Sequence, residues 1–193
     1  MGCKLSAFPI EQGLKLGKEE SESRVNANDP RNNHLEATNR VLGYLEATPG
    51  QGILISRVGD PFLTAYCDSD WLGCPYTRRL RTGYMFLLGG TPISWKTKKK
   101  SLLSRSLAEA EYKAVASTVT ARHISNNPVF HERTKHVEMD CYFVRERVES
   151  KEIIPMKISS KMQIADLLTK GLPTHQLQFL LGKIGITDLH APS

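Results

Sequence analysis

The sequence predicts an α/β fold in which a mixed β-sheet is flanked by helices. Three apolar runs, at residues 62–68, 82–90 and 93–99, follow one another with the composition of β-strands, which indicates an antiparallel meander. Helical periodicity follows the third run, and another strand-like run at residues 152–158 is followed by more helix. This order of strands and helices is typical of an α/β layer.

The chain before the meander begins with a polar segment. Residues 1–33 are rich in charge, so we expect them to be mostly unstructured. Residues 34–50, HLEATNRVLGYLEATPG, have helical spacing, with Asn33 as a candidate N-cap and a Pro-Gly pair at the end. Residues 51–56, QGILIS, predict a short strand. The apolar stripe of the helix consists of Leu35, Thr38, Val41, Leu42 and Leu45.

Helices dominate the chain after the meander. Residues 107–121, LAEAEYKAVASTVTA, favour helix because of their alanines, and Ser104 or Ser106 is a candidate N-cap. Within the strand-like run at residues 152–158, Pro155 implies an edge position or a bulge. Three further helices are expected over residues 137–150, 161–170 and 175–186.

Positive charge is concentrated in one part of the chain. The formal net charge is +6, and the segment between Trp71 and Ala108 holds eight basic residues and no acidic one. This local basicity favours a polyanionic partner, although a solvated charged face would show the same pattern. The eight residues are Arg78, Arg79, Arg81, Lys96, Lys98, Lys99, Lys100 and Arg105.

Acidic residues stand at the ends of the predicted elements. Asp68 and Asp70 end the first strand, Glu109 and Glu111 lie in the first turns of a helix, and Asp166 opens a later helix. Converging carboxylates repel one another unless a cation lies among them, and Mg²⁺ prefers such oxygen ligands. Acids at helix N-termini are also common for a purely local reason, because they favour the helix dipole.

Zinc, disulfide and membrane sites have little support. The four cysteines form no C-x-x-C pair, so we interpret them as reduced thiols of an intracellular protein, in the cytoplasm or nucleus. His131, His136 and Cys141 lack the spacing of a zinc site. No apolar run reaches the length of a membrane span. Of the two tryptophans that could stack bases, Trp71 and Trp95, we expect Trp95 to pack in the core.

Several long motifs resemble one family. Residues 66–116, YCDSDWLGCPYTRRLRTGYMFLLGGTPISWKTKKKSLLSRSLAEAEYKAVA, closely resemble the ribonuclease H segment of copia-type retrotransposon polyproteins. Residues 127–150 and 163–173, NPVFHERTKHVEMDCYFVRERVES and QIADLLTKGLP, resemble later parts of the same segment. Residues 34–52 look like the stretch that joins the reverse transcriptase to the ribonuclease H in that family.

The resemblance implies a ribonuclease H-like fold that cleaves the RNA strand of an RNA–DNA hybrid with Mg²⁺ or Mn²⁺. Asp68, Glu111 and Asp166 match three of the family's four metal-binding carboxylates, with Asp70 and Glu109 as second choices. The family takes its third carboxylate from a CDN-like motif at the end of a fourth strand. Residues 122–127, RHISNN, contain no acid where that motif is expected, so the fourth strand and its Asp are missing.

We therefore expect a degenerate ribonuclease H-like protein that binds an RNA–DNA hybrid or duplex through its basic residues and has lost RNA cleavage. An active two-metal ribonuclease H and a gene-model fragment without selected function remain the alternatives. The expected organisation is a poorly ordered reverse transcriptase remnant (1–33), a connecting helix and strand (34–60), a truncated ribonuclease H-like domain (61–170) and a C-terminal helix and tail (171–193).

Overall fold

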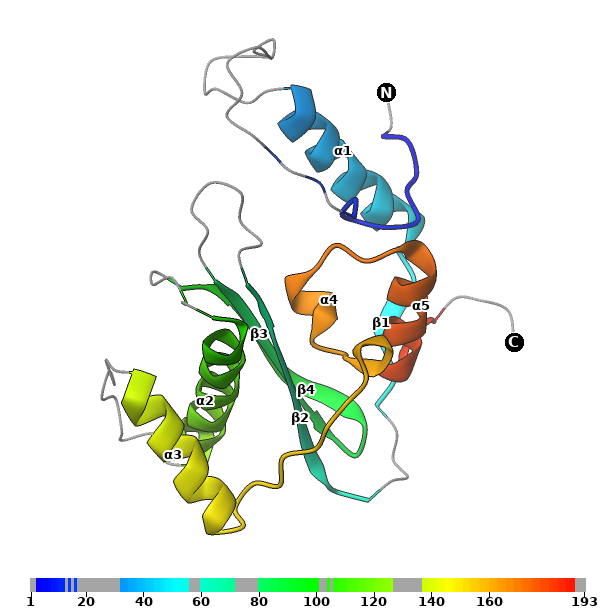
Figure 1. Cartoon of the computed structure of the whole chain (residues 1–193). Coiled ribbons are helices and arrows are strands. Elements are labelled where there is room, and N and C mark those ends of the chain that lie inside the picture. The colour runs from blue at the N-terminus through cyan, green and yellow to red at the C-terminus, as the bar shows by residue number, and fades with distance from the viewer. Residues whose placement is uncertain are drawn as a thin grey trace. The chain divides into compact units, whose positions relative to one another are not determined.

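The computed structural model describes residues 3–12, 14, 16, 32–55, 60–71, 80–100, 104, 106–126 and 137–189. These residues belong to two compact units, each with its own sheet (Figure 1). Residues 58–169 form the meander unit, and residues 1–57 with 170–193 form the terminal unit. The α/β class is confirmed, and every described strand pair is antiparallel.

The meander unit is built on the three strands that the apolar runs predict. They are β2 (Leu63–Asp70), β3 (Arg81–Leu88) and β4 (Thr91–Lys99), in the order β2-β3-β4. Gly89 and Gly90 join β3 to β4 with φ angles of 56° and 83°, the left-handed conformation that a tight hairpin of two residues requires. The meander prediction is therefore confirmed.

Helix α2 (Leu107–Asn126) packs on one face of this sheet. Its N-terminus is capped by Ser106, whose Oγ accepts a hydrogen bond from the Glu109 backbone N–H at 3.1 Å. Ala110 and Ala114 are fully buried, because their short side chains let the helix approach the strands closely.

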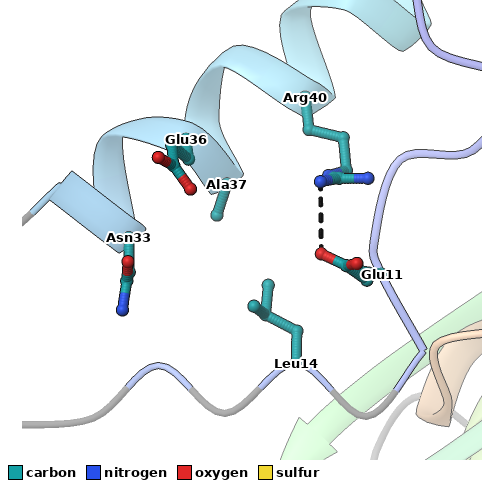
Figure 2. Close-up of a pocket in the computed structure, with 6 residues that line it drawn as sticks. All are labelled: Glu11, Leu14, Asn33, Glu36, Ala37 and Arg40. Carbon is teal, nitrogen blue, oxygen red and sulfur yellow. Dashed lines mark ion pairs between the residues drawn. The ribbon is translucent and has the colours of Figure 1, made fainter.

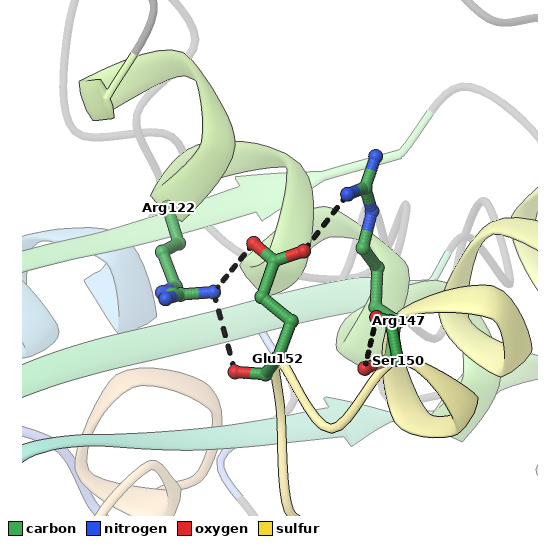
Figure 3. Close-up of polar contacts among 4 residues, drawn as sticks. All are labelled: Arg122, Arg147, Ser150 and Glu152. Carbon is green, nitrogen blue, oxygen red and sulfur yellow. Dashed lines mark hydrogen bonds and ion pairs between the residues drawn. The ribbon is translucent and has the colours of Figure 1, made fainter.

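Helix α3 (Val137–Glu149) packs against α2 and is fastened by one carboxylate. Glu152 accepts hydrogen bonds from Arg122 on α2 and Arg147 on α3, each at 2.8 Å (Figure 3). The guanidinium of Arg122 also lies 3.5 Å from the Glu152 carbonyl oxygen. The two arginines thus hold the turn that follows α3 against the C-terminal part of α2.

The expected strand at residues 152–158 is wrong. These residues form no regular secondary structure, and Ile154 and Met156 are 81% and 86% exposed. Pro155 has no backbone N–H to donate to a ladder, and the apolar side chains beside it find no buried face. The segment leads instead to a short 3-10 helix, η1 (Ser160–Met162), and to helix α4 (Asp166–Thr169).

The terminal unit joins segments from both ends of the chain. Its elements are α1 (Asn32–Ala47), β1 (Gln51–Ile53), α5 (Thr174–Lys183) and β5 (Ile186–Asp188), of which β1 and β5 pair antiparallel. The sequence predicted α1, β1 and α5 but not β5. Gly185, at a φ of 70°, makes the turn from α5 into β5.

Residues 3–12 pack on α1 without forming a helix or strand. Arg40 of α1 pairs with Glu11 at 3.1 Å and lies over the ring of Phe8. A Cβ atom at Gly43 would collide with the carbonyl oxygen of Lys4, so a glycine permits this close approach. Figure 2 shows a shallow pocket between these segments. Its lining residues are Glu11, Leu14, Asn33, Glu36, Ala37 and Arg40.

The apolar stripe predicted for α1 is not a buried face. Leu35, Val41, Leu42 and Leu45 are 39–58% exposed, and Gly43 is the one residue of α1 that is buried. The helical spacing therefore predicted the helix correctly, but the burial of its apolar face was predicted wrongly.

Candidate carboxylate site and nucleic-acid interface

Asp68 lies near the end of β2 and is 5% exposed. Its Oδ2 accepts a hydrogen bond from the hydroxyl of Thr169, the last residue of α4, which is itself 1% exposed. This contact joins the strand-end carboxylate to a helix about a hundred residues later in the chain. The hydroxyl thus satisfies one of the oxygens of a carboxylate that has been removed from water.

Gly83 makes room for this contact. It lies opposite Asp68 on β3, and a Cβ atom there would come 2.8 Å from Leu168 Cβ and 3.0 Å from Thr169 Cγ2. Real Cβ atoms essentially never approach to 2.8 Å. A side chain at Gly83 would therefore push α4 away from the sheet.

Side chains from β3 and β4 bind the last carbonyls of α4. Arg81 donates to the Thr169 carbonyl at 3.1 Å, and Thr97 donates to the Leu168 carbonyl at 3.0 Å. The final carbonyls of a helix have no partner within the helix, so these bonds dock α4 on the strands. Just before α4, Gln163 donates to the Cys67 carbonyl of β2 at 3.1 Å.

Asp166 is the first residue of α4 and is 7% exposed. It lies three positions before Thr169, and helical residues three apart share a face. Asp68 and the helix that carries Asp166 therefore lie on the same side of the sheet. The contact through Thr169 is what connects Asp68 with this helix.

Glu111 belongs to α2, on the other face of the sheet (Figure 1). Successive residues of a strand point to opposite faces, and Cys67, beside Asp68, forms a hydrogen bond with Thr118 of α2. Burial, with smaller contributions from the negative charges of Glu111 and Asp68, raises the pKa of the Cys67 thiol to about 11, although the hydrogen bond with Thr118 lowers it. The Glu111 carboxylate thus acts on β2 from the α2 side.

The described residues do not gather three metal ligands. Carboxylate oxygens are the donors that Mg²⁺ and Mn²⁺ prefer. Among the described residues, however, no three His, Cys, Asp or Glu side chains form a group that could hold a metal ion. The donor chemistry of Asp68, Glu111 and Asp166 therefore suits a divalent cation, whereas their arrangement in this chain does not.

The two second-choice acids have other partners. Glu109 pairs with Lys113 at 2.7 Å, and the ammonium of Lys113, which is 9% exposed as a residue, also donates to Ser104. Asp70 lies opposite Arg81 in the β2–β3 register, a cross-strand pair of opposite charge. Glu109 thus serves to neutralise a buried lysine.

The Cys67 thiol gives a direct chemical test of this packing. Its pKa near 11, against an ordinary 9.0, leaves the thiolate about 100-fold less populated at about pH 8. A thiolate of higher pKa is also more nucleophilic, which offsets part of this effect. We expect iodoacetamide to modify Cys67 roughly 10-fold more slowly than Cys3 in the folded chain, and at a similar rate after denaturation. Peptide mapping by mass spectrometry reads out each cysteine. Equal rates in the folded chain would contradict the burial of β2 under α2.

Basic residues line β4, which is an edge of the described sheet. Lys96, Lys98 and Lys99 are exposed, and Lys100 donates to Ser117 of α2 at 2.8 Å. Arg81 is exposed but uses its guanidinium to hold α4, so its role is at least partly structural. Arg78, Arg79 and Arg105 lie outside the described residues.

The tryptophans differ from each other. Trp71 is anchored, because its indole Nε1 donates to the Ser104 carbonyl at 3.0 Å. The expectation that Trp95 packs in the core is wrong, because it is 53% exposed. The residues of β4 from Ile93 to Lys99 are all exposed, and the indole is among them. His131 and His136, and the side chain of Cys141, lie outside the described part.

Comparison with known proteins explains this combination of elements. The chain is 36% identical, over 82% of its length, to a retrovirus-related Pol polyprotein from transposon RE1 of Arabidopsis thaliana. The chain belongs to the family of copia-type retrotransposon Pol polyproteins. The Pol polyproteins from transposon RE2 of Arabidopsis thaliana and transposon TNT 1-94 of Nicotiana tabacum are 35% and 29% identical over 81% and 82% of the chain. No family model matches, and no solved structure matches significantly.

This Pol segment spans only 13% of the length of the RE1 and RE2 polyproteins. The RE1 alignment runs over 186 residues, whereas 82% of the 193-residue chain is about 158 residues. The difference, 186 − 158, leaves about 28 aligned positions at which this chain has no residue.

None of the described helices of the Pol segment has the length and apolar character needed to cross a bilayer.

Sequence reasoning missed Gly83, Thr97, Gln163 and Thr169, the residues that dock α4. The Gly83 signal was a glycine inside a strand, which often marks a close backbone approach. The other three are ordinary polar residues whose partners only the fold reveals.

Proposed function

We propose that this Pol segment is a degenerate ribonuclease H-like protein that binds nucleic acid, including RNA–DNA hybrid, and does not cleave the RNA strand. The proposal rests mainly on β4 and its connection to α2. Strand β4 presents exposed lysines, and residues 91–100 contain no acid. A basic surface of this kind attracts the phosphate backbone without reading the base sequence.

Loss of cleavage is proposed from the carboxylates. The acid of the CDN-like motif is absent from the sequence, and Asp68 is engaged by Thr169. Asp68 and Asp166 approach one face of the sheet while Glu111 belongs to the helix on the other. Hydrolysis of a phosphodiester through paired metal ions needs carboxylates directed at one point. No three acidic, histidine or cysteine side chains of the described residues form such a group.

An active ribonuclease H is the second candidate, favoured by one observation. Asp68 and Asp166 are both buried, and acidic residues are almost never fully buried unless they are paired. Cleavage assays separate the two candidates, since both predict binding and only one predicts cutting.

Binding is expected to be weak and sensitive to salt. We expect dissociation constants of about 10⁻⁴ to 10⁻⁶ M for duplex or hybrid, with affinity falling linearly on a logarithmic salt scale. The variant Lys96→Gln, Lys98→Gln should reduce the salt slope by about 2, because each lost phosphate contact removes close to one unit. Fluorescence anisotropy of a labelled duplex at several salt concentrations measures both quantities.

A charge-matched variant controls for net charge. Arg145→Gln with Lys157→Gln removes the same two charges from exposed positions on α3 and the segment after it. This control should keep the native slope. Equal effects from both variants would mean that total charge, and not β4, sets the affinity. No binding at low salt would mean that the lysines serve only to protect an edge strand from pairing with other chains.

A further inference from the structure

Trp95 lies in the middle of β4 with 53% of its side chain exposed. Its cross-strand neighbour on β3, Met85, is only 4% exposed. The face of the sheet at this position is therefore covered at Met85, while the indole at the edge meets solvent. An exposed indole leaves a large flat apolar surface available for contact.

Helix α4 does not extend over Trp95. Thr97 marks the position on β4 where α4 is bound, through the Leu168 carbonyl. Residues two apart on a strand share a face, so Trp95 lies on the same face as Thr97, the face on which α4 is bound. It precedes Thr97 by two residues. A helix of four residues is about 6 Å long, which is too short to cover the whole strand.

Two exposed lysines follow this indole along β4. Lys96 and Lys98 are exposed and lie on the other face of the same strand, about 7 Å apart at the usual rise of a strand. Among the described strands β4 pairs only with β3, so long lysine side chains can extend around its open edge. An exposed aromatic ring with lysines on the same edge strand matches a ligand that carries both flat rings and negative charge.

We propose that Trp95 stacks on an unpaired base, so that β4 binds single-stranded nucleic acid in preference to a fully paired hybrid. Lys96 and Lys98, which follow Trp95 on the strand, extend around the open edge of β4 and contact phosphates next to the stacked base. In a duplex the faces of the bases are stacked on one another, so a duplex can contact the lysines through its phosphates but cannot stack on the indole. This inference rests on the proposed nucleic-acid binding of β4. It adds Trp95 as a contact residue and single-stranded nucleic acid as the preferred class of ligand.

Two measurements test the stacking. In a Trp71→Phe background Trp95 is the only tryptophan, and its fluorescence is followed during titration with a short oligo-dT strand or a blunt RNA–DNA hybrid. We expect the single strand to quench it and the hybrid to leave it unchanged. In the native background, anisotropy of the labelled strand should show that Trp95→Ala weakens single-strand binding by about 5-fold to about 150-fold, the range for one stacked base.

The variant Trp95→Phe keeps an aromatic face and should retain much of the affinity, while hybrid binding should change less than about two-fold in both variants. Far-UV circular dichroism checks that each variant is folded. If strand and hybrid bind but Trp95→Ala changes neither, the stacking is overturned and the proposed binding through lysines stands. An absence of binding to any nucleic acid would overturn both. Binding of the single strand without quenching would show that no base stacks on Trp95 and would overturn the stacking.

Discussion

Replacing Gly83 with alanine is expected to lower the free energy of unfolding by about 1–3 kcal/mol, the usual cost of overpacking a filled site. The new methyl group would lie 2.8 Å from Leu168 Cβ and 3.0 Å from Thr169 Cγ2. Because both neighbours belong to α4, relief of the clash would move that helix. The bonds that Arg81 and Thr97 make to its carbonyls, and the bond from Thr169 to Asp68, would lengthen together.

A matched glycine provides the control. Gly182 lies in α5, and a Cβ atom there meets nothing within 4 Å. Gly182→Ala should therefore stabilise the chain by about 0.5–1 kcal/mol, since alanine favours helix over glycine. Urea denaturation followed by circular dichroism measures both variants. A Gly83→Ala variant as stable as the native chain would contradict the docking of α4 on β3.

The local elements of this fold follow from local sequence patterns. Strands β2, β3 and β4 were predicted because β-rich runs alternate with turn residues, and the Gly89–Gly90 pair fits a tight hairpin. Helix α2 was predicted by its alanines and its serine cap. These signals act within a few residues of one another, which is why a single sequence carries them.

What the sequence could not predict depends on contacts between distant segments. The pairing of β1 with β5 joins residues more than 130 positions apart, and β5 is too short to show a pattern of its own. Residues 152–158 have the composition of a strand, yet Pro155 and the lack of a partner leave them irregular. Trp95 is exposed because α4 ends before reaching it, which no periodicity reveals.

In the candidate site, too, some residues were predicted from sequence motifs and others were found only in the structure. The motif resemblance selected Asp68, Glu111 and Asp166, and the structure adds that Asp68 and Asp166 share the α4 side while Glu111 belongs to α2. Their roles in metal binding stay a prediction. The residues that fix α4, and through it the position of Asp166, were invisible to motif matching because hydroxyl and amide side chains make such contacts in every fold.

The absence of RNA cleavage by the native chain is the result with the largest expected effect on function. We expect the purified protein, with Mg²⁺ or Mn²⁺, to bind an RNA–DNA hybrid and to leave its RNA strand intact, as judged by denaturing gels of an end-labelled RNA. Cleavage through paired metal ions needs several carboxylates directed at one point. The acid that the family resemblance leads us to expect is absent from residues 122–127, and no three described acidic, histidine or cysteine side chains form a group that could hold a metal ion.

Restoring the missing segment should restore cleavage. Helix α2 runs through the Arg122–His123 junction to Asn126, so a strand inserted there would begin where a helix now continues. We expect a chain that carries the corresponding RE1 segment at this junction to cut the RNA strand, and the same chain with Asp68→Asn to lose the activity by several orders of magnitude while still binding. Cleavage by the native chain that Asp68→Asn abolishes would refute the proposed loss. In that case Asp70 or Glu109 would have taken the vacant role, and replacing each by its amide would identify which.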